Sequence, residues 1–146
     1  MTYMLEQNLV DDFVRCLPTS PFAEFGPNAI STEFDFRRGR TDIILLTSSN
    51  DVIAIEAKLE KWRIALDQAY RNTSFSHYSY VLLTEKAANL AIKHNDEFYV
   101  RNIGICFLSH QRIQILQKAV RTEPIQLWLY NRAKDVLLNG GKSVEC

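Results

Sequence analysis

The sequence contains few cysteines, and their spacing is not that of a zinc site or of a disulfide framework. The three thiols, Cys16, Cys106 and Cys146, are odd in number, and no CxxC pair occurs. Structural zinc sites and disulfide frameworks both need paired cysteines at characteristic spacings. Neither is therefore expected, and Cys16 and Cys106, which lie in apolar stretches, are expected to be buried thiols.

The sequence also lacks a long apolar run and a leader segment. No run approaches the about 20 apolar residues that a helix needs to span a bilayer. The first residues, Met-Thr-Tyr-Met-Leu-Glu, have no basic segment followed by an apolar one, so no secretory signal is expected. These observations predict a cytoplasmic protein that makes no contact with a membrane.

A strong charge of one sign and the familiar hydrolase motifs are missing as well. The formal net charge is +0, whereas a protein that coats DNA is usually basic overall. A neutral chain can still carry a local basic stripe beside acidic metal ligands, so local charge is more informative. There is no GxSxG motif, and His77, His94 and His110 are isolated, without metal-ligand spacing. A serine hydrolase and a histidine metal site are therefore not expected.

The composition that is present is that of an ordinary globular domain. The chain has 146 residues, of which 47% are apolar and 23% are charged. This length suits one compact domain and allows a core to form without disulfides or structural metals. No internal repeat or low-complexity segment divides the chain, so we expect a single domain over residues 1–146.

Hydrophobic periodicity predicts interleaved helices and strands. An amphipathic helix is expected over residues 3–17, followed by a loop over 18–28 that is rich in breaker residues. The last helix is expected to have Pro124 in its first turn and to stop at Gly140–Gly141. Between them, strands are expected over 31–37, 41–47, 51–58, 77–84, 103–109 and 112–117, and helices over 61–72 and 85–95. The predicted fold class is α/β or α+β, with helices packed on a central mixed sheet.

The third expected strand carries two charged side chains at the end of an apolar stretch. Because side chains alternate along a strand, Glu56 and Lys58 share one face with Val52 and Ala54. A strand this apolar is expected to be buried on both faces. Charges at its end are then costly unless they are paired or bind a metal.

The second and third expected strands form a hairpin. Folding them about the turn at 48–50 places Asp42 opposite Glu56. Directly opposed side chains have Cβ atoms about 5 Å apart, and two carboxylates at that distance repel each other. A hard divalent cation relieves the repulsion, because Mg²⁺ often takes one or two carboxylates together with water and phosphate oxygens. The spacing of Asp42, Glu56 and Lys58 therefore predicts an Mg²⁺ or Mn²⁺ site with an adjacent ammonium group.

Such a site suits the hydrolysis of phosphodiester bonds. A divalent cation lowers the pKa of bound water and neutralises charge on the scissile phosphate. Lys58, two residues after the second carboxylate, can orient or deprotonate the attacking water, or stabilise the charged transition state. We therefore expect a hydrolase that acts on a phosphate ester.

The motif around these residues also resembles a known family. The string GRTDIILL, followed fourteen residues after Asp42 by Glu56 in IEAK, is similar to the D-x(n)-(D/E)-x-K signature of the PD-(D/E)xK nuclease superfamily. That superfamily includes restriction endonucleases, Holliday-junction resolvases and nuclease domains of recombination enzymes. Its core is a helix, three strands, a helix and a further strand, with the signature on the second and third strands. The predicted order over residues 3–84 matches that core.

The resemblance implies a restriction-endonuclease-like fold, with an αβββαβ core and a C-terminal extension. It implies Mg²⁺- or Mn²⁺-dependent cleavage of nucleic acid, with DNA favoured over RNA. Asp42 and Glu56 would be metal ligands together with the main-chain carbonyl of Ala57, and Lys58 would be the catalytic lysine. The residue before Asp42 is Thr41 rather than proline, a departure that is frequent in the superfamily.

Three residues on the expected helices resemble auxiliary members of such sites. Gln68, in DQAYR, is similar to the glutamine that orients the lysine or the water, and a solvent-facing position is an equal alternative for it. Glu6 is similar to an acidic residue that some members add to the metal ligands, although a glutamate on a surface helix is normally just solvated. Arg71 would contact phosphate.

A basic cluster lies close to the strand that carries Asp42. Arg37, Arg38 and Arg40 surround the turn that precedes this strand. Such a cluster is usually a solvated turn, but its position favours contact of Arg38 and Arg40 with the nucleic-acid backbone. By analogy alone, a domain this small is expected to work as a homodimer to hold a duplex.

Two other interpretations of the same residues stay open. The chain can be a nuclease-fold module that binds nucleic acid or regulates a partner without turnover. Alternatively, it can be an adaptor in which Asp42, Glu56 and Lys58 form a structural ion-pair network. Buried charges are more typical of functional sites, so the nuclease is the favoured reading.

Overall fold

The computed structural model describes residues 5–36 and 39–143. The N-terminal half contains α1 (Glu6–Cys16), η1 (Leu17–Thr19), η2 (Pro21–Phe25), β1 (Ala29–Phe36), β2 (Gly39–Leu46), β3 (Val52–Ala57) and α2 (Trp62–Asn72). The C-terminal half contains β4 (Tyr78–Thr84), α3 (Glu85–Ala91), η3 (Ile92–His94), α4 (Asn95–Tyr99), β5 (Ile103–Ser109), β6 (Arg112–Gln117), α5 (Leu127–Gly140) and β7 (Lys142–Ser143).

The strands form one mixed sheet in the order β6-β5-β4-β3-β2-β1-β7. β3, β4 and β5 are parallel, and the remaining pairings are antiparallel. The parallel pairs are joined by the helical segments α2 and α3–α4, because a parallel connection must cross the sheet. The fold class expected from the sequence, helices packed on a central mixed sheet, is confirmed, and α1 to β4 follow the αβββαβ order that the resemblance implies.

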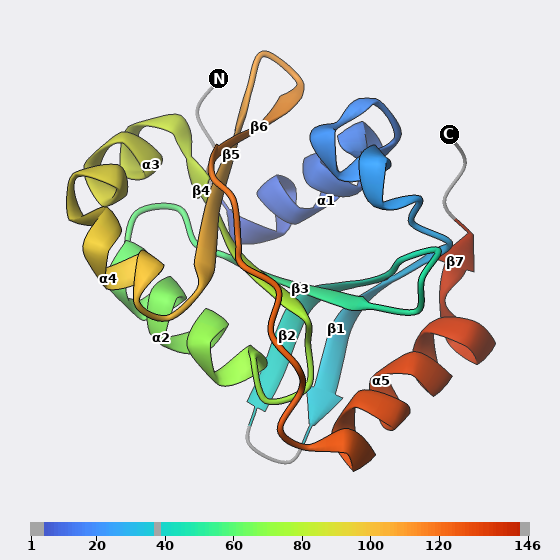
Figure 1. Cartoon of the computed structure of the whole chain (residues 1–146). Helices are drawn as coiled ribbons and strands as arrows, with labels where there is room; N and C mark the ends of the chain where they lie inside the picture. Colours follow the sequence, from blue (N-terminus) through green and yellow to red (C-terminus); the bar gives the residue numbers. More distant parts are fainter. Residues whose placement is uncertain (1–4, 37–38, 144–146) are drawn as a thin grey trace.

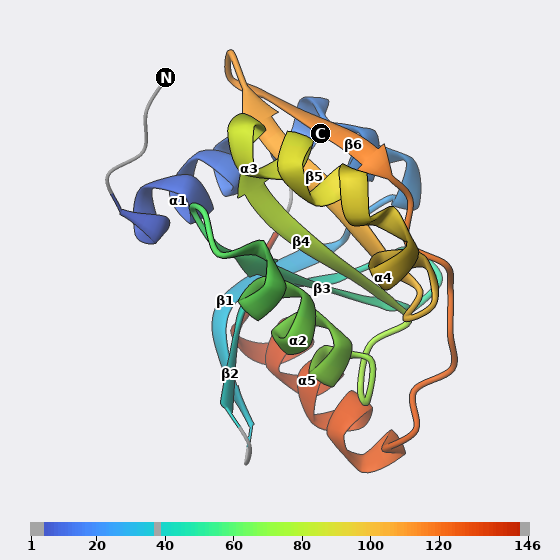
Figure 2. The same cartoon turned by 90° about the vertical axis from the view of Figure 1, so that its left-hand side faces the viewer.

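Helices cover both faces of the sheet (Figures 1 and 2). On one face, α1 and the two 3-10 turns pack on the odd-numbered side chains of β2 and β3, including Ile43, Leu45, Ile53 and Ile55. On the other face, α2, α3 and α4 cover β4 and β5, and α5 covers β1, β2 and the start of β3. Every residue of β3 is buried, which is the expected state of a strand in the middle of a two-sided sheet.

Most element boundaries agree with those expected from the sequence, and the C-terminal helix is the main exception. α5 begins at Leu127, so Pro124 precedes the helix and does not lie in its first turn. Trp128 on α5 and Ile125 just before it fit the helical spacing of the apolar residues in this segment, and they are 55% and 84% exposed. Only one face of α5 meets the sheet, through residues such as Leu129, so apolar side chains on its other faces remain in contact with solvent.

Smaller differences concern local structure. The expected loop over 18–28 contains two 3-10 turns, and β7, which the pattern did not predict, pairs with the start of β1. Tyr70, which fits the helical spacing of the apolar residues of α2, is exposed, as is Leu5 before α1. Among the described residues, no helix combines the length and the apolar character that are needed to cross a membrane.

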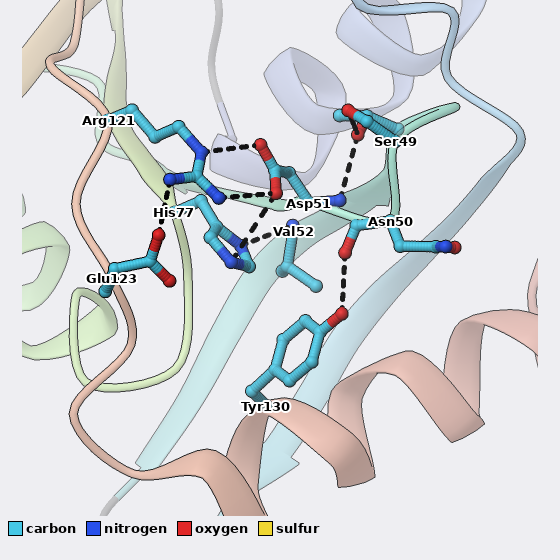
Figure 3. A network of polar contacts seen from close by, with 9 residues as sticks. Ser49, Asn50, Asp51, Val52, His77, Arg121, Glu123 and Tyr130 are labelled. Carbon is cyan, nitrogen blue, oxygen red and sulfur yellow. Dashed lines mark hydrogen bonds and ion pairs between the residues drawn. The ribbon is translucent and has the colours of Figure 1, made fainter.

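A polar network fixes the segment before α5 to the start of β3 (Figure 3). The guanidinium of Arg121 donates two hydrogen bonds to the carboxylate of Asp51, at 2.9 and 3.0 Å. The Tyr130 hydroxyl donates to the main-chain carbonyl of Asn50 at 2.7 Å. Both contacts hold the C-terminal part of the chain against the β2–β3 turn.

His77 lies at the centre of this network and is buried. Its Nδ1 accepts a hydrogen bond from the main-chain N–H of Val52 at 3.0 Å, and its Nε2 lies 3.5 Å from Asp51 Oδ1. Burial lowers the pKa of His77 below its usual value, against the attraction of Asp51. The Val52 contact acts in the same direction, because an Nδ1 that accepts a hydrogen bond cannot carry a proton. The network is therefore built around the neutral imidazole.

We expect His77→Ala to destabilise the protein by about 2 kcal/mol at pH 8, since a buried ring and its hydrogen bonds are lost. The folded-state pKa of His77 lies below the ordinary histidine value of 6.5, so the stabilisation by His77 is complete above pH 6.5 and is lost as the pH falls. The difference between wild type and variant in denaturant melts should therefore shrink between pH 7 and pH 5. His94→Ala, at a half-exposed histidine, is the control, and a gap that stays constant with pH would contradict the neutral state of His77.

Candidate metal and nuclease site

The ladder between β2 and β3 ends where the first candidate carboxylate stands. The last pair is Ile43 with Ile55, so the register places Asp42 level with Glu56, as the turn length predicted. No ladder pair follows it, and Asp42 Oδ2 accepts a hydrogen bond from the main-chain N–H of Ala57 at 2.8 Å. The Asp42 side chain thus replaces a ladder contact and is fixed next to Glu56.

The ladder on the other side of β2 is also interrupted at this level. β1 pairs Thr32 with Ile43 and Phe34 with Thr41, which leaves Glu33 and Asp42 without a ladder pair between them. Glu33 has a φ of 57°, a left-handed conformation that costs a residue with a Cβ atom roughly 1–2 kcal/mol. The strained backbone and the two interrupted ladders coincide at Asp42, and such coincidences are more common at functional sites.

Glu56 is a buried carboxyl group beside a second carboxyl group. Its side chain is 3% exposed, and its pKa is raised to about 8, first by burial and then by the proximity of Asp42. A hydrogen bond that Glu56 Oε1 accepts from Asn72 Nδ2 at 3.0 Å works in the opposite direction. Without a bound metal ion, Glu56 therefore keeps its proton at neutral pH.

The sequence analysis missed Asn72 as a member of the site. Asn72 is fully buried at the end of α2, and its Oδ1 accepts a hydrogen bond from the Thr41 hydroxyl at 2.8 Å. Asn72 thus links the strand residue before Asp42 to the carboxyl group of Glu56. A signal was present in the sequence, because Asn72 follows Ala65 and Ala69 at the spacing of the buried stripe. A polar residue at such a position needs buried partners.

Gln68 lies one turn before Asn72 on α2, so the two side chains leave the same face of the helix. The Gln68 Oε1 atom is buried and accepts no hydrogen bond from the part of the chain that is described. An unpaired buried oxygen is costly. A water molecule or a ligand donor at this position would satisfy it.

Arg71, between these two residues, crosses from α2 to the β1–β2 hairpin. Its Nη2 lies 3.9 Å from Glu56 Oε1 and 3.4 Å from the main-chain carbonyl of Arg40. Its guanidinium stacks over the ring of Phe36, 5.1 Å from the centroid. Gly39 leaves room for this side chain, since a Cβ atom there would lie 2.7 Å from Arg71 Nη1. These contacts hold the positively charged guanidinium of Arg71 beside the carboxyl groups of Asp42 and Glu56.

Lys58 lies just beyond the end of β3 and is three-quarters buried. Its Nζ is 3.6 Å from Glu6 Oε1, which comes from the first turn of α1. The structure thus brings Lys58 and Glu6 together as an ion pair, while Asp42 and Glu56 form the neighbouring carboxyl pair. β3 ends at Ala57, and the main-chain N–H of Lys58 still donates a hydrogen bond to the carbonyl of Leu82 on β4 at 3.0 Å.

The two arginines of the expected phosphate contact differ in what can be said of them. Arg40 is exposed on β2, level with Asp35 of β1. Arg38 lies outside the described residues. The described basic group on this side is therefore Arg40 together with Arg71.

The groups present suit a hard divalent cation. The carboxyl groups that lie together are those of Asp42 and Glu56. Within residues 5–36 and 39–143, no cluster of three or more His, Cys, Asp or Glu side chains is placed to hold a metal. Two carboxylates with further oxygens from main chain, water or phosphate are an ordinary Mg²⁺ environment. The raised pKa of Glu56 and the unpaired Gln68 Oε1 are both features that a bound cation with its water would relieve.

Comparisons with known proteins bear on the fold alone. No protein-family model matches the chain, and no curated protein matches its sequence. A protein of unknown function from Silicibacter pomeroyi has a similar structure, with a TM-score of 0.56, 13% identity and 94% of each chain covered. At this identity the likeness shows a shared fold and says nothing about activity.

Two further solved structures are more distant. A repair endonuclease from Pyrococcus abyssi has a TM-score of 0.46 and 17% identity, over 75% of this chain and 49% of the endonuclease. SfsA from Pyrococcus furiosus, solved in complex with Ca²⁺, also has a TM-score of 0.46, with 10% identity over 78% of this chain and 64% of SfsA. The chain spans about half the length of the endonuclease.

The raised pKa of Glu56 predicts an unusual pH dependence of stability in metal-free protein. The unfolded carboxyl group titrates near 4.5 and the folded one near 8, so its stabilisation is complete below pH 4.5 and is lost as the pH rises through 8. Glu56→Gln keeps an oxygen for the Asn72 bond and stays neutral. We expect it to be more stable than wild type by on the order of 3 kcal/mol at pH 9, with little difference at pH 4.5.

Thermal and denaturant melts in EDTA across this pH range test the expectation. Glu24→Gln, at an exposed glutamate of η2, is the matched control and should show no such trend. If Glu56→Gln is equally or less stable than wild type throughout, Glu56 is not a strained buried acid.

Proposed function

We propose that the protein is a metal-dependent nuclease that hydrolyses phosphodiester bonds, most readily in DNA. The observation that carries the proposal is the pair of carboxyl groups of Asp42 and Glu56, one half-buried and one fully buried, with Lys58 two residues further along the chain. Stability alone does not favour this arrangement, because burial and Asp42 together hold the pKa of Glu56 near 8. A reaction that depends on a metal ion bound by Asp42 and Glu56 would explain why the two carboxyl groups lie together, since strongly shifted pKa values are typical of functional sites.

Asp42 and Glu56 would hold an Mg²⁺ or Mn²⁺ ion, with the main-chain carbonyl of Ala57 as a further ligand. When bound, the ion would lower the pKa of a water molecule and offset the charge of the scissile phosphate. Asn72 keeps the Glu56 carboxylate in position through its side-chain amide. Gln68 would accept a hydrogen bond from the attacking water, since its Oε1 is buried near this point without another donor in the described structure.

Lys58 would act on the attacking water or on the charged phosphate in the transition state. The carboxylate of Glu6 helps to hold the Lys58 side chain in place, since Glu6 Oε1 lies 3.6 Å from the Lys58 ammonium group. A phosphate that approaches the site would compete with Glu6 for this cation. In this proposal Glu6 is therefore a positioning residue for Lys58, and a role of Glu6 as a further metal ligand is the alternative.

Nucleic acid would approach over the side of the site where Arg71 and Arg40 lie. Contacts to phosphate fix the position of a nucleic acid without reading its sequence, and both guanidinium groups suit such contacts. Arg38 is proposed as part of the same contact. A homodimer would present two such sites to the two strands of a duplex, and the oligomeric state belongs to the proposal.

The test is a cleavage assay on plasmid, linear, branched and single-stranded DNA and on RNA. Cutting should require Mg²⁺ or Mn²⁺ and should stop in EDTA. Asp42→Asn and Lys58→Met should each lose at least about 100-fold in rate, because each removes a charge from the reaction centre. Lys61→Met, at the exposed lysine three residues on, is the matched control and should cut like wild type.

The interpretation as a binding or regulatory module predicts a different result. In that case, folded wild-type protein would cut no substrate in the panel, and Mg²⁺ would not raise its melting temperature. Cutting that persists in both Asp42→Asn and Lys58→Met would instead exclude this site as the reaction centre.

A further inference from the structure

A concave site lies next to the candidate reaction centre along the chain. A pocket of about 570 Å³ opens at the carboxyl ends of the parallel strands β3, β4 and β5, within the range of about 300–1,000 Å³ that is typical of small-ligand pockets. The chain itself joins the two, since the pocket lining begins at Leu59, directly after Lys58. The Cα atoms of Lys58 and Leu59, as consecutive residues, are about 3.8 Å apart.

The pocket has apolar walls and a polar rim. Leu59, Ala87, Leu90 and Leu108 supply the walls. Leu90 lies on α3 and remains 48% exposed, so an apolar surface is left for a ligand to cover. The rim includes the polar side chains of Glu60, Glu85, Lys86, Ser109, His110 and Gln111.

Part of this rim is held in a costly backbone conformation. His110 and Gln111 form the two-residue turn between β5 and β6, with φ values of 51° and 61°. A turn with two positive φ angles strongly prefers Asn-Gly, because glycine adopts this conformation without a steric penalty. Here two long polar side chains occupy it and line the pocket. Strain of this kind that persists at a cavity points to a role for the side chains themselves.

We propose that this pocket takes one base of an unpaired nucleotide, next to the phosphate that is cleaved. The inference rests on the proposed nuclease function and names its substrate class, a nucleic acid that is single-stranded or unpaired at the cut. A flat base is apolar on its faces and carries hydrogen-bonding groups on its edge, which matches apolar walls with a polar rim. A base inside an intact duplex cannot enter a pocket.

The charges of the lining favour a base over a phosphate group. Glu60 and Glu85 contribute two carboxylates and Lys86 contributes one ammonium group. The Ser109 hydroxyl is already engaged, since it donates to Glu85 at 3.0 Å. An anion would meet net repulsion there, whereas the amide of Gln111 and the imidazole of His110 can pair with the edge of a neutral base.

Gln111→Gly separates recognition from stability. The variant removes a rim side chain and relieves the strain of a positive φ, so its melting temperature should equal or exceed that of wild type. Its affinity for single-stranded DNA should nevertheless fall by about tenfold, the effect of losing one well-paired polar contact. Asn102→Gly is the matched control, because Asn102 also has a positive φ of 64° but precedes β5 at the end of the strand remote from the pocket.

The measurement is an abasic scan in EDTA, which prevents cleavage. Dissociation constants are measured by anisotropy at low salt for a short single-stranded deoxyoligonucleotide and for versions that each lack one base. Wild type and Asn102→Gly should bind most weakly when the base is missing at one position near the middle. Gln111→Gly should show a flat profile, and the fully paired duplex should bind wild type more weakly than the single strand.

A flat profile for wild type, no binding of the single strand, or equal behaviour of Gln111→Gly and wild type would each overturn the inference. Metal-dependent cleavage in the assay of the preceding section would then still support the nuclease, so failure of the pocket and failure of the function are distinguishable. Conversely, a base-dependent profile without any cleavage would keep the pocket and reject the hydrolysis.

Discussion

The burial of the Glu56 carboxyl group beside that of Asp42 is the constraint around which the rest of the site is arranged. A carboxyl group at the end of a fully buried strand loses its hydration, and a second carboxyl group close by adds repulsion. The structure offsets this cost with specific contacts. Asn72 donates to Glu56, the main-chain N–H of Ala57 donates to Asp42, and Arg71 lies within ion-pair distance. The residual cost appears as the raised pKa of Glu56.

The same constraint accounts for the backbone in this part of the sheet. If β2 continued its pairing with β3, the main chain at Asp42 would occupy the place that its carboxylate now takes. Both ladders of β2 are instead interrupted at Asp42, and Glu33 adopts a strained conformation on β1. The hydroxyl of Thr41, the residue before Asp42, donates a hydrogen bond to Asn72. The missing ladder pairs at Asp42 and the hydrogen bonds among the polar side chains around it therefore occur together at the same place in the sheet.

The two ends of the central sheet have opposite electrostatic character. At the start of β3, His77 is buried as a neutral base and Asp51 is held as an anion by Arg121, so this end is favoured at neutral pH and above. At the other end of β3, Glu56 is buried as a neutral acid, and that end is favoured below neutral pH. The contacts at the start of β3 fix the segment that leads to α5 against the sheet. The second keeps a carboxyl group whose pKa burial and Asp42 hold near 8, although the guanidinium of Arg71 lies 3.9 Å away.

Local pattern in the sequence was enough for the order of the elements, the mixed sheet, and the opposition of Asp42 and Glu56. Alternation, helical periodicity and turn length are local properties, and β3 and the β2–β3 turn obey them. The sequence could not predict the ion pair of Lys58 with Glu6, the contacts of Asn72, or the pocket at the ends of β3, β4 and β5. Each of these depends on which helix covers which face of the sheet, and contacts between segments far apart in the chain follow from tertiary packing alone. For the same reason Trp128 and Ile125 fit a helical stripe in the sequence and are nevertheless exposed, since only the packing of α5 decides which part of that stripe meets the sheet.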